Sequence, residues 1–207
     1  MKKIISIMMV LALLLMPVLS LAEAAEELAA YESYTHTNDQ FTILYPNNWF
    51  LLNAENITTV LESVDDTQDE QLSQLIATYS PQIQQLDMVM FLSETGLTNI
   101  NIVCQEVGVA LTGDMLMTMA PTLVAQLSST MEGIEFTDEG SLLEINGVES
   151  LIVEYTNELA GEQMQGAQVY VPGSSSLCIF TLTCLNADEF TATSEAFGIM
   201  LNTLEVK

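Results

Sequence analysis

The stretch DQFTILYPNNWFLLN, residues 39–53, shows how the folded domain begins. Its apolar side chains occupy every second position, which is the pattern of a half-buried β strand. These positions are Phe41, Ile43 and Tyr45. Pro46 has no N–H to donate to a neighbouring strand, so we expect the strand to end there. Asn47 and Asn48 suit a turn, and we expect Trp49 to fold back beneath the sheet and to be largely buried.

Helical patterns precede, interrupt and follow the predicted strands. Asp65 and Asp66 are expected in the first turn of a helix, where acidic side chains favour the helix dipole. A second short helix is expected to start at Pro81, because proline suits the first helical position. Residues 114–131 predict a longer helix, which Pro121 should kink or delay.

The strand patterns are short and separated by turn residues. Thr95-Gly96 and Asn146-Gly147 predict tight turns between strands, and Asn-Gly is the stronger hairpin signal. Asn186 and Glu189 form a capping box that should open a last helix. The strands themselves are predicted at residues 88–94, 99–111, 134–137, 141–145, 148–156, 168–171 and 177–185.

This order of elements predicts an α+β domain built on an antiparallel sheet. Residues 25–38 lack a clear hydrophobic period, so we interpret them as a mobile leader. Residues 39–207 are then expected to form a single domain, long enough to bury a substantial core.

Residues 1–24 have the pattern of a secretory signal peptide: two lysines, an apolar run and then small residues. An A-x-A tripeptide predicts cleavage after Ala24, with cleavage after Ala22 as the second choice. No cysteine stands near this site, so a lipoprotein is not expected. The alternative is an uncleaved anchor, although the apolar run is somewhat shorter than a membrane span. We therefore expect a secreted protein.

The charge of the chain excludes several classes of partner. Of 28 acidic residues only Glu23 would leave with the signal peptide, whereas Lys2 and Lys3 are two of the 3 basic residues. The chain from Ala25 on therefore carries 27 acidic residues against Lys207 and has a formal charge of −26. Nucleic acids and anionic membrane surfaces require basic side chains, so neither is an expected partner. Loosely bound cations are compatible with this charge.

The chain has 3 cysteines, Cys104, Cys178 and Cys184, and export would allow them to form disulfides. Cys178 and Cys184 lie in one predicted strand, about 20 Å apart, so they cannot pair with each other. At most one bridge is possible, from Cys104 to either of the other two. Three buried thiols are the favoured interpretation, because an odd number of cysteines is weak evidence for a disulfide framework.

The order of these motifs resembles the PsbP-like family over residues 39–206. The resemblance is carried by FTILYPNNW (41–49), INGVESLIVEYT (145–156), LCIFTLTCL (177–185) and the closing MLNTLEV (200–206). The family includes extrinsic proteins of photosystem II, a nuclear release factor for the Ran GTPase and many exported bacterial proteins. The resemblance implies a central antiparallel sheet sandwiched by helices, without an established catalytic centre. Photosystem II docking uses basic surfaces that this chain lacks, so no functional residue is transferred.

Catalytic residues are not expected. His36 is the only histidine and falls in the predicted leader, so it is a poor base for a serine or cysteine nucleophile. Lys207 stands last in the sequence and is not placed to form a Schiff base. Paired carboxylates could hydrolyse glycosides, but so many acids produce suitable pairs by chance.

Two groups of residues are weak candidates for metal ligands. Whether the chain has a metal site therefore stays open. The cluster Asp65, Asp66, Asp69 and Glu70 could bind calcium, but it lacks the glycine of a calcium loop, and the start of a helix explains it more simply. Alternate methionines in Met115–Met119 could hold copper(I) in an extended segment. In a helix the same methionines are interpreted as core packing. The glycosylation pattern at Asn56 is interpreted as chance.

The sequence therefore favours a secreted, non-enzymatic binding or accessory module, without a cofactor, that recognises a protein or small-molecule partner through a sheet edge or loop surface. An extracellular protein that binds divalent cations, calcium or manganese, is the alternative. A hydrolase that uses carboxylates is the third hypothesis.

The mature protein is expected to begin at Ala25, because the A-x-A site is well formed and no lipidation cysteine is present. Intact-mass measurement of the protein recovered from the medium of its native host checks this. A mass that retains residues 1–24 would contradict the prediction.

Overall fold

The computed structural model describes residues 28–67, 70–159 and 162–207. In these residues an eight-stranded antiparallel sheet has the order β3-β4-β5-β10-β9-β8-β6, and β7 pairs with β8 beside β6. The strands are β3 (Phe50–Leu52), β4 (Val89–Leu92), β5 (Thr98–Glu106), β6 (Glu135–Phe136), β7 (Ser141–Ile145), β8 (Val148–Leu159), β9 (Glu162–Pro172) and β10 (Ser176–Cys184).

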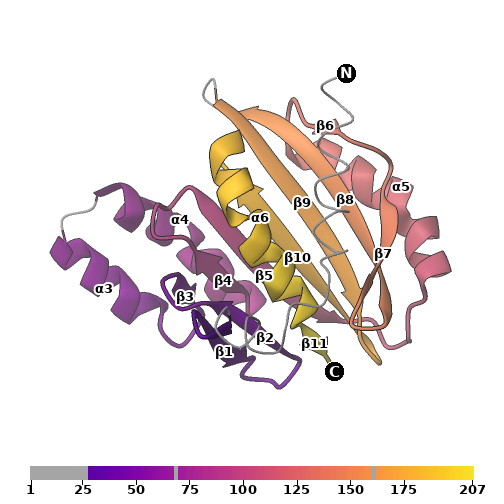
Figure 1. Ribbon diagram of the computed structural model, residues 1–207, viewed down its shortest axis with the longest axis horizontal. Coiled ribbons are helices and arrows are strands. Elements are labelled where there is room, and N and C mark those ends of the chain that lie inside the picture. Colours follow the sequence, from indigo (N-terminus) through magenta and orange to yellow (C-terminus); the bar gives the residue numbers. More distant parts are fainter. Residues whose placement is uncertain (1–27, 68–69, 160–161) are drawn as a thin grey trace.

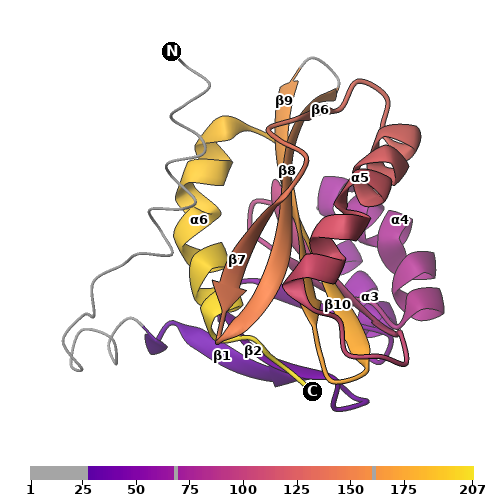
Figure 2. The same ribbon diagram turned by 90° about the vertical axis from the view of Figure 1, so that its right-hand side faces the viewer.

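Helices cover both faces of this sheet, so the fold is the predicted α+β sandwich (Figures 1 and 2). One face carries α6 (Ala187–Asn202). The other face carries α3 (Ile57–Thr67) and α4 (Glu70–Leu86) over one end of the sheet and α5 (Gly113–Thr130) over the other. Along β10, Phe180 and Leu182 point into the α6 core, and Leu177 and Ile179 pack with the core beneath α5.

A small second sheet contradicts the predicted leader. Its order is β1-β2-β11, formed by β1 (Tyr31–Thr35), β2 (Phe41–Pro46) and β11 (Glu205–Val206). Tyr34 of β1 is buried, and its ring lies 6.0 Å from the rings of both Phe41 and Phe91. The interpretation of residues 25–38 as a mobile leader is therefore wrong for β1. A polar strand with one buried aromatic side chain leaves almost no periodic signal.

The turn after β2 forms as predicted, but Trp49 is less buried than expected. The strand ends at Pro46, and the Trp49 N–H donates to the Pro46 carbonyl at 3.0 Å. The indole is half-buried and packs against the core beneath α6.

The first two helices differ from the prediction. Helix α3 begins at Ile57, because Asn53 and Asn56 cap it reciprocally: each backbone N–H donates to the other side-chain oxygen, at 2.9 and 3.0 Å. Asp65 and Asp66 therefore belong to its last turns and not to a first turn. Helix α4 runs through Pro81 without a break.

Asn56 does more than cap α3. Its side-chain amide also donates to the Leu51 carbonyl at 2.8 Å, so the nitrogen that glycosylation would modify is engaged in the fold.

The later caps and hairpins confirm the prediction. Asn186 accepts from the Glu189 N–H at 2.8 Å and caps α6. Asn146 and Gly147 both have positive φ, 49° and 79°, as a two-residue hairpin requires. Strand β9 is longer than expected and pairs with β8 as far as Leu159 and Glu162.

Within the described residues no helix is both long and apolar enough to cross a membrane.

One disulfide joins Cys104 to Cys178, which stand directly opposite each other in the β5–β10 pairing. The favoured interpretation of three free thiols is therefore wrong, whereas the limit of one bridge is confirmed. Cys184 is a buried thiol, and its sulfur lies 3.5 Å from the hydroxyl oxygens of Thr98 and Thr193.

Gly166 should tolerate no side chain, because a Cβ there would overlap the ring of the buried Tyr155 on the neighbouring strand. We expect Gly166→Ala to lower the free energy of unfolding by about 1–3 kcal/mol. The same change at Gly198 in α6 meets no atom within 4 Å and should instead gain up to about 1 kcal/mol from helix propensity. Urea denaturation with the disulfide intact checks both signs, and a loss at both positions would contradict this account.

Candidate binding groove

A groove lies on the α5 side of the sheet, between α5 and the strands β5, β10 and β9. Its volume is ≈ 540 Å³. Helix α5 covers one part of this face and α4 another (Figure 2), and the groove lies beside α5. Its lining consists of Gln105, Val107, Met119, Thr122, Leu123, Gln126, Leu127, Thr130, Gln168, Tyr170, Leu177 and Ile179.

None of these lining residues is charged, although the whole chain has a formal charge of −25. The sequence contains the reason: no charged residue occurs from Met115 to Met131, which covers nearly all of α5. None occurs from Gln163 to Ala187 either, which covers β10 and nearly all of β9. These neutral runs were the available sequence signal for the groove, but only the fold brings them together.

The polar groups on the groove floor are largely satisfied by one another. The Tyr170 hydroxyl donates to Gln168 Oε1 at 2.5 Å, and Gln168 Nε2 donates to Thr181 Oγ1 at 3.2 Å. Burial, followed by the nearby Tyr155, raises the pKa of Tyr170 to about 12, so this phenol stays neutral at physiological pH. The floor therefore offers mainly apolar contact with a few amide and hydroxyl groups, which suits binding rather than acid–base catalysis.

The methionines near this groove are partly exposed. Met119 lines the groove, whereas Met115 and Met117 are 42% and 38% exposed on α5. The interpretation of all three as core packing is therefore wrong for Met115 and Met117. Because the segment is helical, it does not present its sulfur atoms as an extended strand would.

A second hollow lies on the opposite face, between the sheet and α6. Apolar residues from four strands and from α6 surround it. The polar side chains in its lining are Glu154 and Ser194. Burial raises the pKa of Glu154 from 4.5 to about 7, and the charge of Asp138 adds to this shift. The enclosed space is ≈ 20 Å³, about the room of one water molecule, so it is a poor site for an organic substrate.

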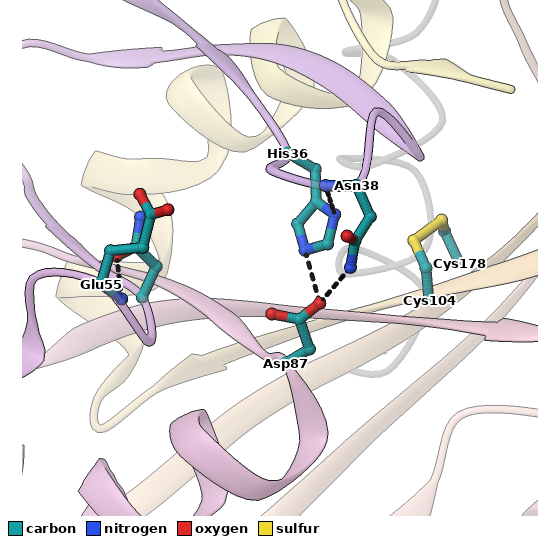
Figure 3. Close-up of polar contacts among 7 residues, drawn as sticks. His36, Asn38, Glu55, Asp87, Cys104 and Cys178 are labelled. Atoms are coloured by element: carbon teal, nitrogen blue, oxygen red, sulfur yellow. Dashed lines mark hydrogen bonds and ion pairs between the residues drawn. A yellow bond between two sulfur atoms is a disulfide. The ribbon is translucent and has the colours of Figure 1, made fainter.

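His36 is a buried structural residue and not part of a mobile leader, with 3% of its surface exposed. Its Nε2 lies 3.6 Å from Asp87 Oδ2, and Asn38 Nδ2 donates to the same oxygen at 2.7 Å (Figure 3). The ring stacks on Phe41 with the centroids 5.1 Å apart, and Nδ1 accepts from the Asn38 N–H at 3.4 Å. These contacts fasten the β1–β2 turn to the α4–β4 loop and direct neither ring nitrogen at a serine or cysteine.

Lys207 is also engaged in the fold. Its ammonium pairs with Asp39, and its backbone N–H donates to the Gln40 carbonyl at 2.9 Å. Both groups hold β11 beside β2.

The predicted metal ligands remain untested. Asp65 and Asp66 end α3, Glu70 begins α4, and Asp69 lies outside the described residues, as do the signal peptide and its cleavage site. Among the side chains that the structure describes, no three of the types His, Cys, Asp and Glu gather closely enough to share a metal ion.

Comparison with known proteins identifies the fold. No protein-family model and no curated protein matches the sequence. The solved structure of CyanoP, the PsbP of the cyanobacterium Synechocystis, is similar with a TM-score of 0.56 and 15% identity, over 86% of this chain and 94% of that one. A Bacteroides thetaiotaomicron structure gives a TM-score of 0.50 and 12% identity over 86% of this chain, which spans only 49% of that one.

The Ran-binding protein Mog1p of Saccharomyces cerevisiae is similar with a TM-score of 0.48 and 7% identity, over 85% of this chain and 95% of that one. At such identities structural likeness establishes the fold alone. The predicted PsbP-like fold is confirmed.

The raised pKa of Glu154 predicts that stability falls as the pH rises. Below about pH 4.5 the carboxyl is protonated in both the folded and the unfolded chain, so its burial costs little. Between about pH 4.5 and 7 the unfolded chain ionises first, and stability is lost progressively. Because Glu154 is only partly buried, we expect Glu154→Gln to recover about 1–2 kcal/mol at pH 8 and nothing at pH 4.

Thermal or urea unfolding at several pH values measures this difference. Glu144→Gln, at an exposed position of the neighbouring β7, is the control and should not change the pH profile relative to the wild type. Parallel profiles for the wild type and Glu154→Gln would contradict the prediction.

Proposed function

We propose that this protein is an exported, non-enzymatic binding module that recognises a protein segment through the α5 groove. The observation that carries the proposal is the contrast between an uncharged, mainly apolar groove and a surface dominated by carboxylates. The carboxylates keep the protein soluble, and the groove is where contact can remove apolar surface from water.

Two observations support export. The first 24 residues have the signal-peptide pattern, and disulfides such as Cys104–Cys178 persist mainly in oxidising compartments. The bridge connects the two strands that carry Gln105, Leu177 and Ile179 in the groove lining, so oxidation would also hold that part of the groove floor in register.

The chemistry of the hollows supports binding rather than catalysis. The groove lining contains hydroxyl and amide groups but no histidine, carboxylate or amine to act as a general base. The hollow with Glu154 has a carboxyl of suitable pKa but little space for a substrate. Neither hollow combines a nucleophile, a base and room for a reacting molecule.

Placing charge in the groove tests this function. A library of random 15-residue peptides is selected on the folded, oxidised protein, and the selected peptides are measured by fluorescence anisotropy. Thr122→Glu with Gln126→Glu places two carboxylates in the groove at exposed positions one helical turn apart. We expect this variant to weaken peptide binding at least about tenfold, because apolar contacts must then desolvate a charge.

Ala125→Glu with Ser129→Glu is the matched control. It adds the same charge at the same spacing to exposed positions of α5 outside the groove lining. This variant should bind within about twofold of the wild type. Equal losses in both variants, or selected peptides that ignore both, would refute the groove as the binding surface.

A further inference from the structure

Most sulfur atoms in the described residues are either buried or already oxidised. Cys104 and Cys178 share the disulfide, and Cys184 is a fully buried thiol. Burial raises the pKa of the Cys184 thiol, which leaves little of the reactive thiolate. Four methionines are at most 7% exposed: Met88, Met90, Met164 and Met200.

The thioethers of α5 are the exception. Met115 and Met117 are 42% and 38% exposed, and they are the only methionines among the exposed large apolar side chains of the described residues. Met119 is half-buried and lines the groove, and Met131 is half-buried just beyond the helix. An oxidant that attacks sulfur in this part of the chain therefore meets α5 first.

Helical geometry places the two exposed methionines on opposite sides of α5, which packs one face on the sheet (Figure 2). Met115 lies one turn before Met119, and residues four apart share a helix face. Met119 lines the groove together with Thr122. Met115 therefore extends this wall beyond the hollow, towards the start of α5. Met117 is two residues from each of the other methionines, about 200° around the helix, and points away from the wall.

The wall belongs to a largely apolar surface. Val107 in the groove lining is 36% exposed, and Val109 is 53% exposed in the connection from β5 to α5. The groove lining itself carries no charged residue. A bound segment would pack apolar side chains against Met115 and Met119, whose flexible and polarisable thioethers adapt to irregular partners.

We propose that Met115 and Met119 form an oxidation site through which peroxides control binding in the groove. A lone pair of the thioether sulfur attacks one oxygen of hydrogen peroxide, so that an S–O bond forms and the O–O bond breaks. The proton on the transferred oxygen moves to the departing oxygen, which leaves as water. Sulfur loses two electrons, and the peroxide gains them.

The product, methionine sulfoxide, is a polar side chain in place of an apolar one. A segment packed against this wall would cover the new oxygen with apolar groups. Burying a polar group without a hydrogen bond is unfavourable, so binding should weaken. The proposal rests on the proposed function, because it assigns a means of regulation to the same groove.

Site-resolved mass spectrometry tests the order of oxidation. The folded, disulfide-bonded protein is exposed to hydrogen peroxide for increasing times, digested, and the sulfoxide fraction of each methionine is measured. We expect Met115 and Met117 to oxidise at least about fivefold faster than the buried Met90 and Met200, because attack requires access to the sulfur.

Protection by a bound peptide tests the position of Met115. The probe is one of the selected 15-residue peptides, chosen without methionine or cysteine and added at a saturating concentration. It should slow the oxidation of Met115 at least about threefold and leave that of Met117 unchanged, because only Met115 stands on the groove side of α5. Equal protection of both would contradict the proposal, as would a Met115 that oxidises no faster than the buried methionines.

Dissociation constants before and after peroxide treatment test the effect on binding. Each protein is compared with itself, using the same peptide after the peroxide has been removed. We expect the wild type to bind about tenfold more weakly after treatment. Met115→Leu with Met119→Leu lacks both sulfur atoms of the wall, so its affinity should change less than about twofold on treatment. Met117→Leu is the matched control and should lose affinity as the wild type does.

The remaining outcomes separate this proposal from the function on which it rests. If Met115 and Met119 oxidise without a change in affinity, while Thr122→Glu with Gln126→Glu still blocks the peptide, the groove binds segments but oxidation does not control it. If Met117→Leu preserves binding as well as the double leucine variant does, or if the latter loses affinity like the wild type, oxidation acts elsewhere and the proposal is overturned. If no selected peptide depends on the groove, both proposals fail.

Discussion

The layers of this protein depend on strand β10, whose side chains are used on both faces of the sheet. Phe180 and Leu182 face α6, and Leu177 and Ile179 face the α5 side. Such a strand cannot shift by one residue without exchanging its two faces, so the pairing of β10 with β5 and β9 has to be specific. The Cys104–Cys178 bridge fixes the pairing of β10 with β5 covalently. Both helical layers then pack on a sheet of defined register.

The groove follows from an incomplete layer. Helices α3 and α4 pack over β3 and β4, and α5 packs over β8 and β9, so the strands between them have less helical cover. A soluble acidic protein would ordinarily place charged side chains on such a surface. Here Gln105, Gln168 and Ile179 occupy it instead. Uncharged side chains cost less to remove from water than charged ones, which makes this surface suited to a partner.

Local patterns predicted the elements whose signals lie within a few residues. The Asn146-Gly147 hairpin, the Asn186 cap of α6 and the end of β2 at Pro46 all belong to this class. Features that depend on distant residues were missed. Strand β1 is recognisable through its pairing and through Tyr34, and the disulfide requires the β5–β10 register to bring its two sulfurs together. The groove combines the two neutral runs with the end of β5, so the sequence contained its uncharged residues but did not indicate that they lie together.

The small sheet has a consequence for the order of folding. Strand β2, residues 41–46, pairs on one side with β1 and on the other with β11 at residues 205–206. The rings of β2 also complete the core beneath α6, which is itself formed late in the chain. As the chain emerges from a ribosome or a translocation channel, β2 therefore lacks β11 and α6 until almost all of the chain has emerged. Such long-range pairing slows folding and keeps the early segments open for longer, so this domain is expected to fold after its synthesis rather than during it.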